Sequence, residues 1–106
     1  MKNTIIKGFD NEVVFVFEFT GAFAAGGLSN FNEIKVFIGS EEYSNVADPL
    51  NLEVTSNTEL ALRIGDTTAL TEGFYYPKIV GYNVMYDDGF VLTSENYNQI
   101  NPIRIA

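Results

Sequence analysis

Carboxylates are the side chains of this sequence that could take part in acid–base chemistry. There are 14 Asp and Glu residues, but no His and no Cys. A Ser–His–acid triad and a thiol nucleophile are therefore excluded. The acidic pairs Glu41-Glu42 and Asp87-Asp88 are adjacent in sequence, and neighbours on a strand point to opposite faces. They do not form the facing pair that glycoside hydrolysis needs, so we expect surface and turn roles and no enzyme.

The spacing of the aspartates and glycines does not indicate a metal site or a cofactor site. Four aspartates fall in predicted loops, where calcium usually finds its oxygen ligands; they are Asp48, Asp66, Asp87 and Asp88. No D-x-D-x-D-G loop is present, and each Asp is also a common turn residue. Gly26-Gly27 lacks the further glycines of a GxGxxG nucleotide loop. We expect no catalytic residue, no metal and no cofactor.

The net charge of −8 narrows the choice of partners. The six basic residues are scattered singly along the chain, at Lys2, Lys7, Lys35, Arg63, Lys78 and Arg104. Nucleic-acid binding needs clustered basic side chains, and an anionic membrane surface repels an acidic protein. No apolar run reaches the roughly 18 residues of a membrane span, and residues 1–12 show no secretory signal. We expect neither a nucleic-acid nor a membrane partner, and synthesis in the cytoplasm.

Short runs of β-branched and aromatic residues, separated by Gly, Asn, Asp and Pro, indicate an all-β domain. The predicted strands are residues 3–7, 12–20, 33–39, 41–45, 51–56, 59–65, 74–87, 89–94 and 100–105. Ile34, Val36 and Ile38 point to one face and Glu33 and Lys35 to the other, as in an antiparallel sheet with one buried face. We predict one domain over residues 1–106, built as an antiparallel two-sheet sandwich of the immunoglobulin-like type.

Two turns carry specific structural predictions. The L-x-x-G-x-Y pattern of Leu70, Gly73 and Tyr75 is typical of a tyrosine corner, in which the Tyr hydroxyl bonds to backbone a few residues upstream. We expect Tyr75 to be buried and bonded within residues 68–73. Asp88-Gly89 stands between apolar alternations and predicts a two-residue hairpin turn of type I′.

The uncharged segment 21–32, GAFAAGGLSNFN, is unusually apolar for a connection between strands. Phe23, Leu28 and Phe31 stand among residues too small to shield them, and monomers rarely leave such a patch in water. One interpretation folds the segment wholly onto its own core. The other, which we favour slightly, packs Phe23 and Leu28 against a neighbouring subunit, with Phe31 nearer the core.

Tyrosines are crowded in the last third of the chain, at Tyr75, Tyr76, Tyr82, Tyr86 and Tyr97. Exposed aromatic side chains are what a carbohydrate-binding module would need. Tyr is also frequent within strands and at protein interfaces. A small carbohydrate-binding or adhesion module is therefore the alternative to a structural protein.

The order of these signals resembles a known group of domains. The apolar run 13–19, the strand 33–39 ending in Gly, the L-R-I-G strand end 62–65, the L-x-x-G-x-Y motif and the Asp-Gly turn follow one another. This order is similar to that of the immunoglobulin-like β-sandwich domains of tailed-bacteriophage virion proteins, such as the N-terminal domain of baseplate upper proteins and related capsid or tail accessory proteins.

The resemblance covers about residues 10–105 and implies a structural virion component without an active site. It implies other virion proteins, or further copies of the chain, as partners. Because no separate attachment or receptor-binding domain follows the last predicted strand, we expect a small capsid or tail accessory role rather than receptor binding.

Overall fold

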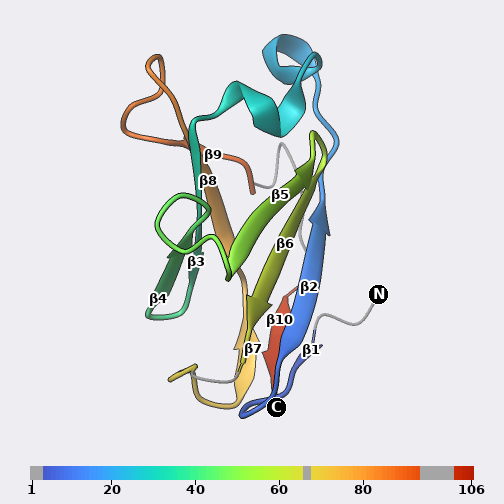
Figure 1. Ribbon diagram of the computed structural model, residues 1–106, viewed down its shortest axis with the longest axis vertical. Helices are drawn as coiled ribbons and strands as arrows, with labels where there is room; N and C mark the ends of the chain where they lie inside the picture. Colours follow the sequence, from blue (N-terminus) through green and yellow to red (C-terminus); the bar gives the residue numbers. More distant parts are fainter. Residues whose placement is uncertain (1–3, 66–67, 94–101) are drawn as a thin grey trace.

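The computed structural model describes residues 4–65, 68–93 and 102–106 (Figure 1). Its strands are β1 (Thr4–Ile5), β2 (Asn11–Val16), β3 (Glu33–Ile38), β4 (Glu41–Ser44), β5 (Leu52–Ser56), β6 (Glu59–Ile64), β7 (Gly73–Tyr75), β8 (Lys78–Tyr82), β9 (Phe90–Val91) and β10 (Ile103–Ile105). Two short 3-10 helices, η1 (Gly21–Phe23) and η2 (Gly27–Asn30), lie between β2 and β3. The prediction of an all-β chain is confirmed.

The strands form three sheets. Two are antiparallel, with the orders β2-β6-β5 and β4-β3-β8-β9, and the third has the order β1-β10-β7. In this third sheet β1 runs parallel to β10, whereas β10 is antiparallel to β7. The expected arrangement of two purely antiparallel sheets is therefore replaced, in the described residues, by three sheets with one parallel pair.

The predicted long strand 74–87 is divided into two elements. β7 ends at Tyr75, β8 begins at Lys78, and Tyr76-Pro77 separates them. A proline has no backbone N–H to donate to a ladder, which explains the break at this point. The two halves pair with different partners, β7 with β10 and β8 with β3 and β9.

A continuous cluster of buried apolar side chains holds the three sheets together. The alternation predicted for β3 is present, since Ile34, Val36 and Ile38 are all buried and point to one face. The cluster extends from Ile5 in β1 to Ile105 in β10. All three sheets therefore contribute to the same core.

The molecule is elongated, with a longest dimension of 39 Å. Figure 1 shows the β1–β2 turn and β7 at the lower end of the long axis, and η1, η2 and the β8–β9 connection at the upper end. The lower turn is fixed by Asn11, whose Oδ1 accepts from the Ile6 backbone N–H at 3.0 Å and whose Nδ2 donates to the Phe9 carbonyl at 2.9 Å. Each end of the molecule carries exposed apolar side chains, Phe9 and Phe74 at the lower end and Val84 and Met85 at the upper end.

Candidate functional site

The segment 21–32 folds onto the core of its own chain. The side chains of Phe23, Leu28 and Phe31 are 8%, 1% and 7% exposed. The expectation that Phe23 and Leu28 pack against a neighbouring subunit is therefore wrong about where these side chains lie. These apolar side chains belong to the buried core cluster of their own chain and are covered by it, so they offer little surface to a partner.

A glycine at position 27 allows this segment to approach the β5–β6 turn closely. Its φ is +50°, and a Cβ atom at this position would lie 2.3 Å from the carbonyl oxygen of Asn57. The next residue, Leu28, donates its backbone N–H to the same carbonyl at 2.8 Å. Any side chain at position 27 would displace this contact, so the glycine fixes how the segment lies on the sheets.

An aromatic cluster connects η1 to the β8–β9 connection. The ring of Phe23 lies 5.1 Å from that of Phe31, 5.0 Å from that of Phe90 and 5.9 Å from that of Tyr86, measured between centroids. The rings of Tyr86 and Phe90 are 5.1 Å apart at a steep angle. Offset and edge-on aromatic pairs of this kind add stability beyond the area they bury, so the upper end of the molecule is a packed unit.

The hairpin at Asp88-Gly89 differs from its prediction. The last pairs of the ladder are Val80 with Val91 and Gly81 with Phe90, which leaves residues 83–89 as the connection. The Gly89 backbone N–H donates to the Tyr86 carbonyl at 3.1 Å, which makes Asp87 and Asp88 the central turn residues. Gly89 has a φ of +98°, whereas no described non-glycine residue has a positive φ.

The prediction of a type I′ turn centred on Asp88-Gly89 is therefore wrong, because that turn requires a positive φ at both residues and Asp88 does not have one. The positive φ belongs to the glycine that follows the turn, and the connection is longer than two residues.

The first part of this connection, residues 83–86, forms a closed turn that sequence reasoning missed. The Asn83 backbone N–H donates to the Tyr86 carbonyl at 3.3 Å, and Asn83 Oδ1 accepts from the Tyr86 N–H at 2.7 Å. Asn83 Nδ2 also donates to the Asn30 carbonyl of η2 at 2.9 Å. At the apex of this 83–86 turn, Val84 and Met85 are 92% and 79% exposed.

The signal that indicates this turn is Asn83, since Asn commonly initiates turns. Reading residues 74–87 as one strand concealed it.

The tyrosine-corner hydrogen bond is present. The Tyr75 hydroxyl donates to the Thr71 carbonyl at 2.9 Å and lies 3.0 Å from Thr71 Oγ1. Leu70 is buried and Gly73 has a φ of +148°. The Tyr75 side chain is half-buried rather than buried, so that part of the prediction is wrong.

The acidic pair Glu41-Glu42 makes two separate structural interactions. Glu41 accepts a hydrogen bond from Thr68, and Glu42 forms an ion pair with Lys35 at 3.7 Å. Burial, with the neighbouring Glu41 carboxylate as the second cause, raises the pKa of Tyr43 to about 12. The two carboxylates thus do not act together on a common site.

Among the described residues, no three His, Cys, Asp or Glu side chains are grouped so that they could hold a metal ion. Asp48 is used within its own loop, where its Oδ2 accepts from the Ser44 N–H at 2.9 Å. Asp66 and Tyr97 lie outside the described residues.

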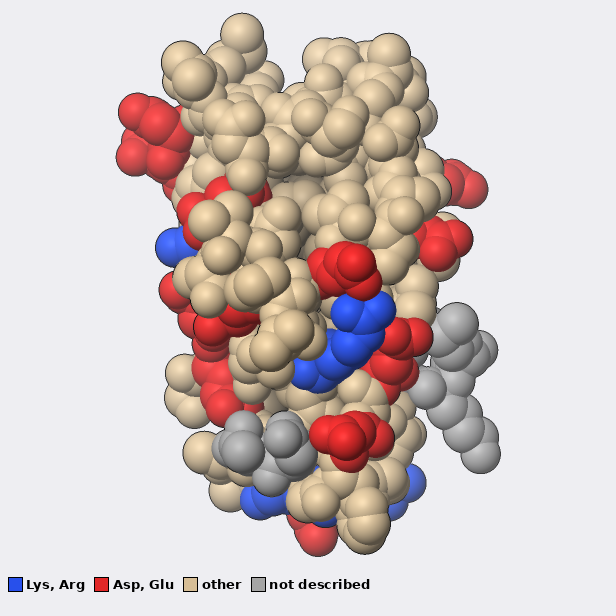
Figure 2. Space-filling model, in the orientation of Figure 1, with Lys and Arg blue, Asp and Glu red and all other residues tan. Residues whose placement is uncertain are grey.

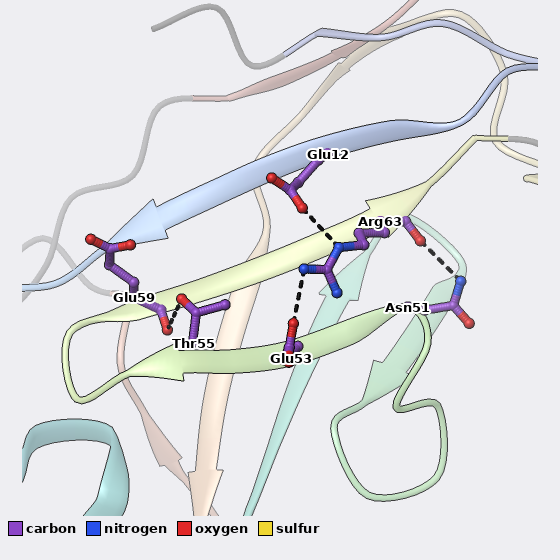
Figure 3. A network of polar contacts seen from close by, with 6 residues as sticks. All are labelled: Glu12, Asn51, Glu53, Thr55, Glu59 and Arg63. Atoms are coloured by element: carbon purple, nitrogen blue, oxygen red, sulfur yellow. Dashed lines mark hydrogen bonds and ion pairs between the residues drawn. The ribbon is translucent and has the colours of Figure 1, made fainter.

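Arg63 forms a polar network on the outer face of the β2-β6-β5 sheet (Figure 3). Its Nε lies 2.7 Å from a Glu12 oxygen and its Nη2 lies 2.8 Å from a Glu53 oxygen, so one guanidinium connects all three strands. The hydrogen bond to Glu12 and, to a lesser extent, the one to Glu53 raise the pKa of Arg63 above its ordinary value.

The Arg63 side chain also lines a groove of about 640 Å³ together with Asp10, Leu50 and Asn51. Glu12 and Glu53 already pair with the Arg63 guanidinium, so Arg63 offers this groove no free positive charge with which to bind an anion.

Two exposed aromatic side chains stand on β7 and just after it. Phe74, on β7, is 70% exposed, and Tyr76, which directly follows β7, is 77% exposed. A hollow of about 390 Å³ beside Phe74 is also lined by Glu72 and Arg104. The other described tyrosines are half-buried, so the tyrosines do not form one platform.

The chain was compared with protein-family models, curated proteins and solved structures, and none of them matched. The helices of the described residues are too short to cross a membrane.

Proposed function

We propose that this chain is a non-enzymatic structural and assembly protein of a tailed-bacteriophage virion, a small capsid or tail accessory subunit that docks on other virion proteins. In this proposal the domain is an immunoglobulin-like sandwich. The β2-β6-β5 sheet forms one layer, and the other two sheets form the second, since only Tyr76-Pro77 separates β7 from β8. The hydrogen bond from Tyr75, at the end of β7, to Thr71 supports the immunoglobulin-like assignment.

The observation that carries the proposal is the exposure of large apolar side chains at both ends of the long axis. At the lower end Phe9 and Phe74 are 66% and 70% exposed. At the upper end Val84 and Met85 are more exposed still. Exposed apolar side chains mark interaction surfaces where they lie together, as the sequence neighbours Val84 and Met85 do. A subunit placed between neighbours in a particle would cover both ends, whereas a single binding pocket would explain one.

The charge distribution fits the same proposal. Figure 2 shows acidic side chains spread over the visible face, while the upper end is almost free of charged atoms apart from an acidic group at its edge. Depletion of charge is typical of the centre of a protein interface.

The test is quantitative mass spectrometry of purified virions from the native source. The proposal expects peptides of this chain in virions at a fixed ratio to the major structural proteins, retained through density-gradient purification. Their absence from purified virions, with the protein found free in the infected cell, would refute the virion role.

A carbohydrate-binding function is the second candidate, and Phe74 and Tyr76 favour it. These aromatic faces, with Glu72 and Arg104 at the adjacent hollow, provide both stacking and hydrogen-bonding groups. A glycan array probed with the isolated chain tests this function. Binding that is lost in Phe74→Ala/Tyr76→Ala, and kept in the control Val84→Ala/Met85→Ala, would support it.

A further inference from the structure

We infer that the 83–86 turn inserts Val84 and Met85 into an apolar pocket on another virion protein, and that Lys or Arg side chains line the rim of that pocket. The inference rests on the proposed function and specifies the chemistry of the partner. It concerns the upper end of the molecule alone.

The 83–86 turn is held in place before any partner binds. Both of its ends are closed on each other by the two hydrogen bonds between Asn83 and Tyr86. Asn83 is attached to η2 through the Asn30 carbonyl, and the Tyr86 ring packs on Phe23 and Phe90. A preorganised loop loses little conformational freedom on binding, which increases affinity for a given contact area.

The two apex side chains contribute almost nothing to the fold itself. Val84 is 92% exposed and Met85 is 79% exposed. The hydrogen bonds that hold the 83–86 turn therefore do not serve to bury these two side chains. Met is enriched at protein interfaces and adapts to irregular pockets. The fixed turn and the exposed apolar pair together indicate a surface made for contact.

The charges next to the apex define the rim of the pocket. Asp87 and Asp88 directly follow the 83–86 turn and are both exposed. In the described part of the chain, neither takes part in an ion pair. Complementary charge at an interface rim steers association and selects the partner. Lys or Arg on the partner would meet these two carboxylates as the apolar apex enters.

The same charges disfavour a second copy of this chain as the occupant. Each copy carries a net charge of −8, and bringing like charges together opposes association. A basic partner surface satisfies both the apolar apex and the acidic rim.

The experiment measures binding of the purified full chain to virions assembled without it. Three double variants are compared with wild type by co-sedimentation over a range of concentrations. Val84→Ser/Met85→Ser removes the apolar apex, and Asp87→Lys/Asp88→Lys reverses the rim charge. Val46→Ser/Leu50→Ser is the matched control, because Val46 and Leu50 are 62% and 85% exposed in another loop. Thermal unfolding of each variant establishes that it is folded.

The inference expects wild-type affinity for the control and at least about tenfold weaker binding for the apex variant. It expects weaker binding for the charge-reversed variant, which added salt strengthens because salt screens the repulsion between the new Lys side chains and the basic rim. If the wild-type chain binds virions and the apex variant binds them equally well, this inference is overturned and the proposed function remains intact. Binding unaffected by charge reversal would overturn the basic rim. Sedimentation equilibrium showing apex-dependent self-association would make a second copy the occupant. Wild-type chain that does not bind virions would overturn the proposed function and this inference with it.

Discussion

At the residue scale, Tyr75 shows how one hydroxyl can fasten a loop. Its two partners both belong to Thr71, one through the backbone carbonyl and one through the side chain. Tyr75→Phe keeps the ring and removes the hydroxyl. We expect a loss of about 0.5–1 kcal/mol in the free energy of unfolding, at the lower end for a hydrogen bond because the group is only half-buried.

Urea denaturation measures this difference, with Tyr76→Phe as the matched control on an exposed neighbour. Equal midpoints for the two variants would show that the Thr71 contact adds nothing to stability.

Tyr43 gives the protein a predicted response to alkaline pH. Its pKa rises from 10.0 to about 12 on folding, mainly through burial and then through the nearby Glu41 carboxylate. Between these values the folded state keeps a proton that the unfolded state has released, so stability falls as pH increases through this window. Below pH 10 the contribution is present in full.

We expect the unfolding midpoint to decrease between pH 10 and about 12 in the wild type, and to decrease less in Tyr43→Phe. Chemical denaturation across this range measures it, and Tyr76→Phe serves as the control that retains the wild-type slope. Parallel slopes in all three proteins would contradict the assignment to Tyr43.

At the scale of elements, the η1–η2 segment belongs to the core rather than to an interface. Phe23 contacts three other aromatic rings, those of Phe31, Tyr86 and Phe90. Phe23→Ala leaves a cavity among them, and we expect a loss of about 3–5 kcal/mol. That is a large fraction of the roughly 5–15 kcal/mol that stabilises a domain.

Thermal and urea unfolding measure the loss, with the exposed Ala24→Ser as the control in the same segment. A Phe23→Ala protein of near wild-type stability would return this segment to the role of a docking loop.

The strands are the most predictable elements, because the alternation of apolar and polar residues that indicates a strand lies within the strand's own sequence. Ile34, Val36 and Ile38 share one face, while Glu33 and Lys35 lie on the other, and this pattern indicates which face of β3 is buried. The tyrosine corner was equally local, since its donor and acceptor are four residues apart.

The candidate site was harder to predict, because burial in it depends on distant partners. Phe23 is covered by Tyr86 and Phe90, which come from the other end of the chain. Nothing near Phe23 in sequence distinguishes that cover from a neighbouring subunit. The exposure of Val84 and Met85 is missed for a different, local reason, because residues 74–87 resemble one continuous strand unless Asn83 is recognised as a turn residue.

At the scale of the whole molecule, the first and last strands meet. β1 runs parallel to β10, with Thr4 opposite Arg104 and Ile5 opposite Ile105. The pairing is extended by the Lys7 N–H, which donates to the Ala106 carbonyl at 3.0 Å, and by the Ala106 N–H, which donates to the Ile5 carbonyl at 2.9 Å.

This pairing determines how the domain carries mechanical load. Tension applied before β1 and after β10 draws two parallel strands past each other, so their hydrogen bonds are loaded in shear and must break together. Tension between residues 32 and 46 acts at the open end of the antiparallel β3–β4 hairpin, where bonds separate one after another. Single-molecule pulling should therefore give a higher rupture force through the two ends of the chain than across that hairpin. Equal rupture forces would mean that the β1–β10 pair does not act as a clamp.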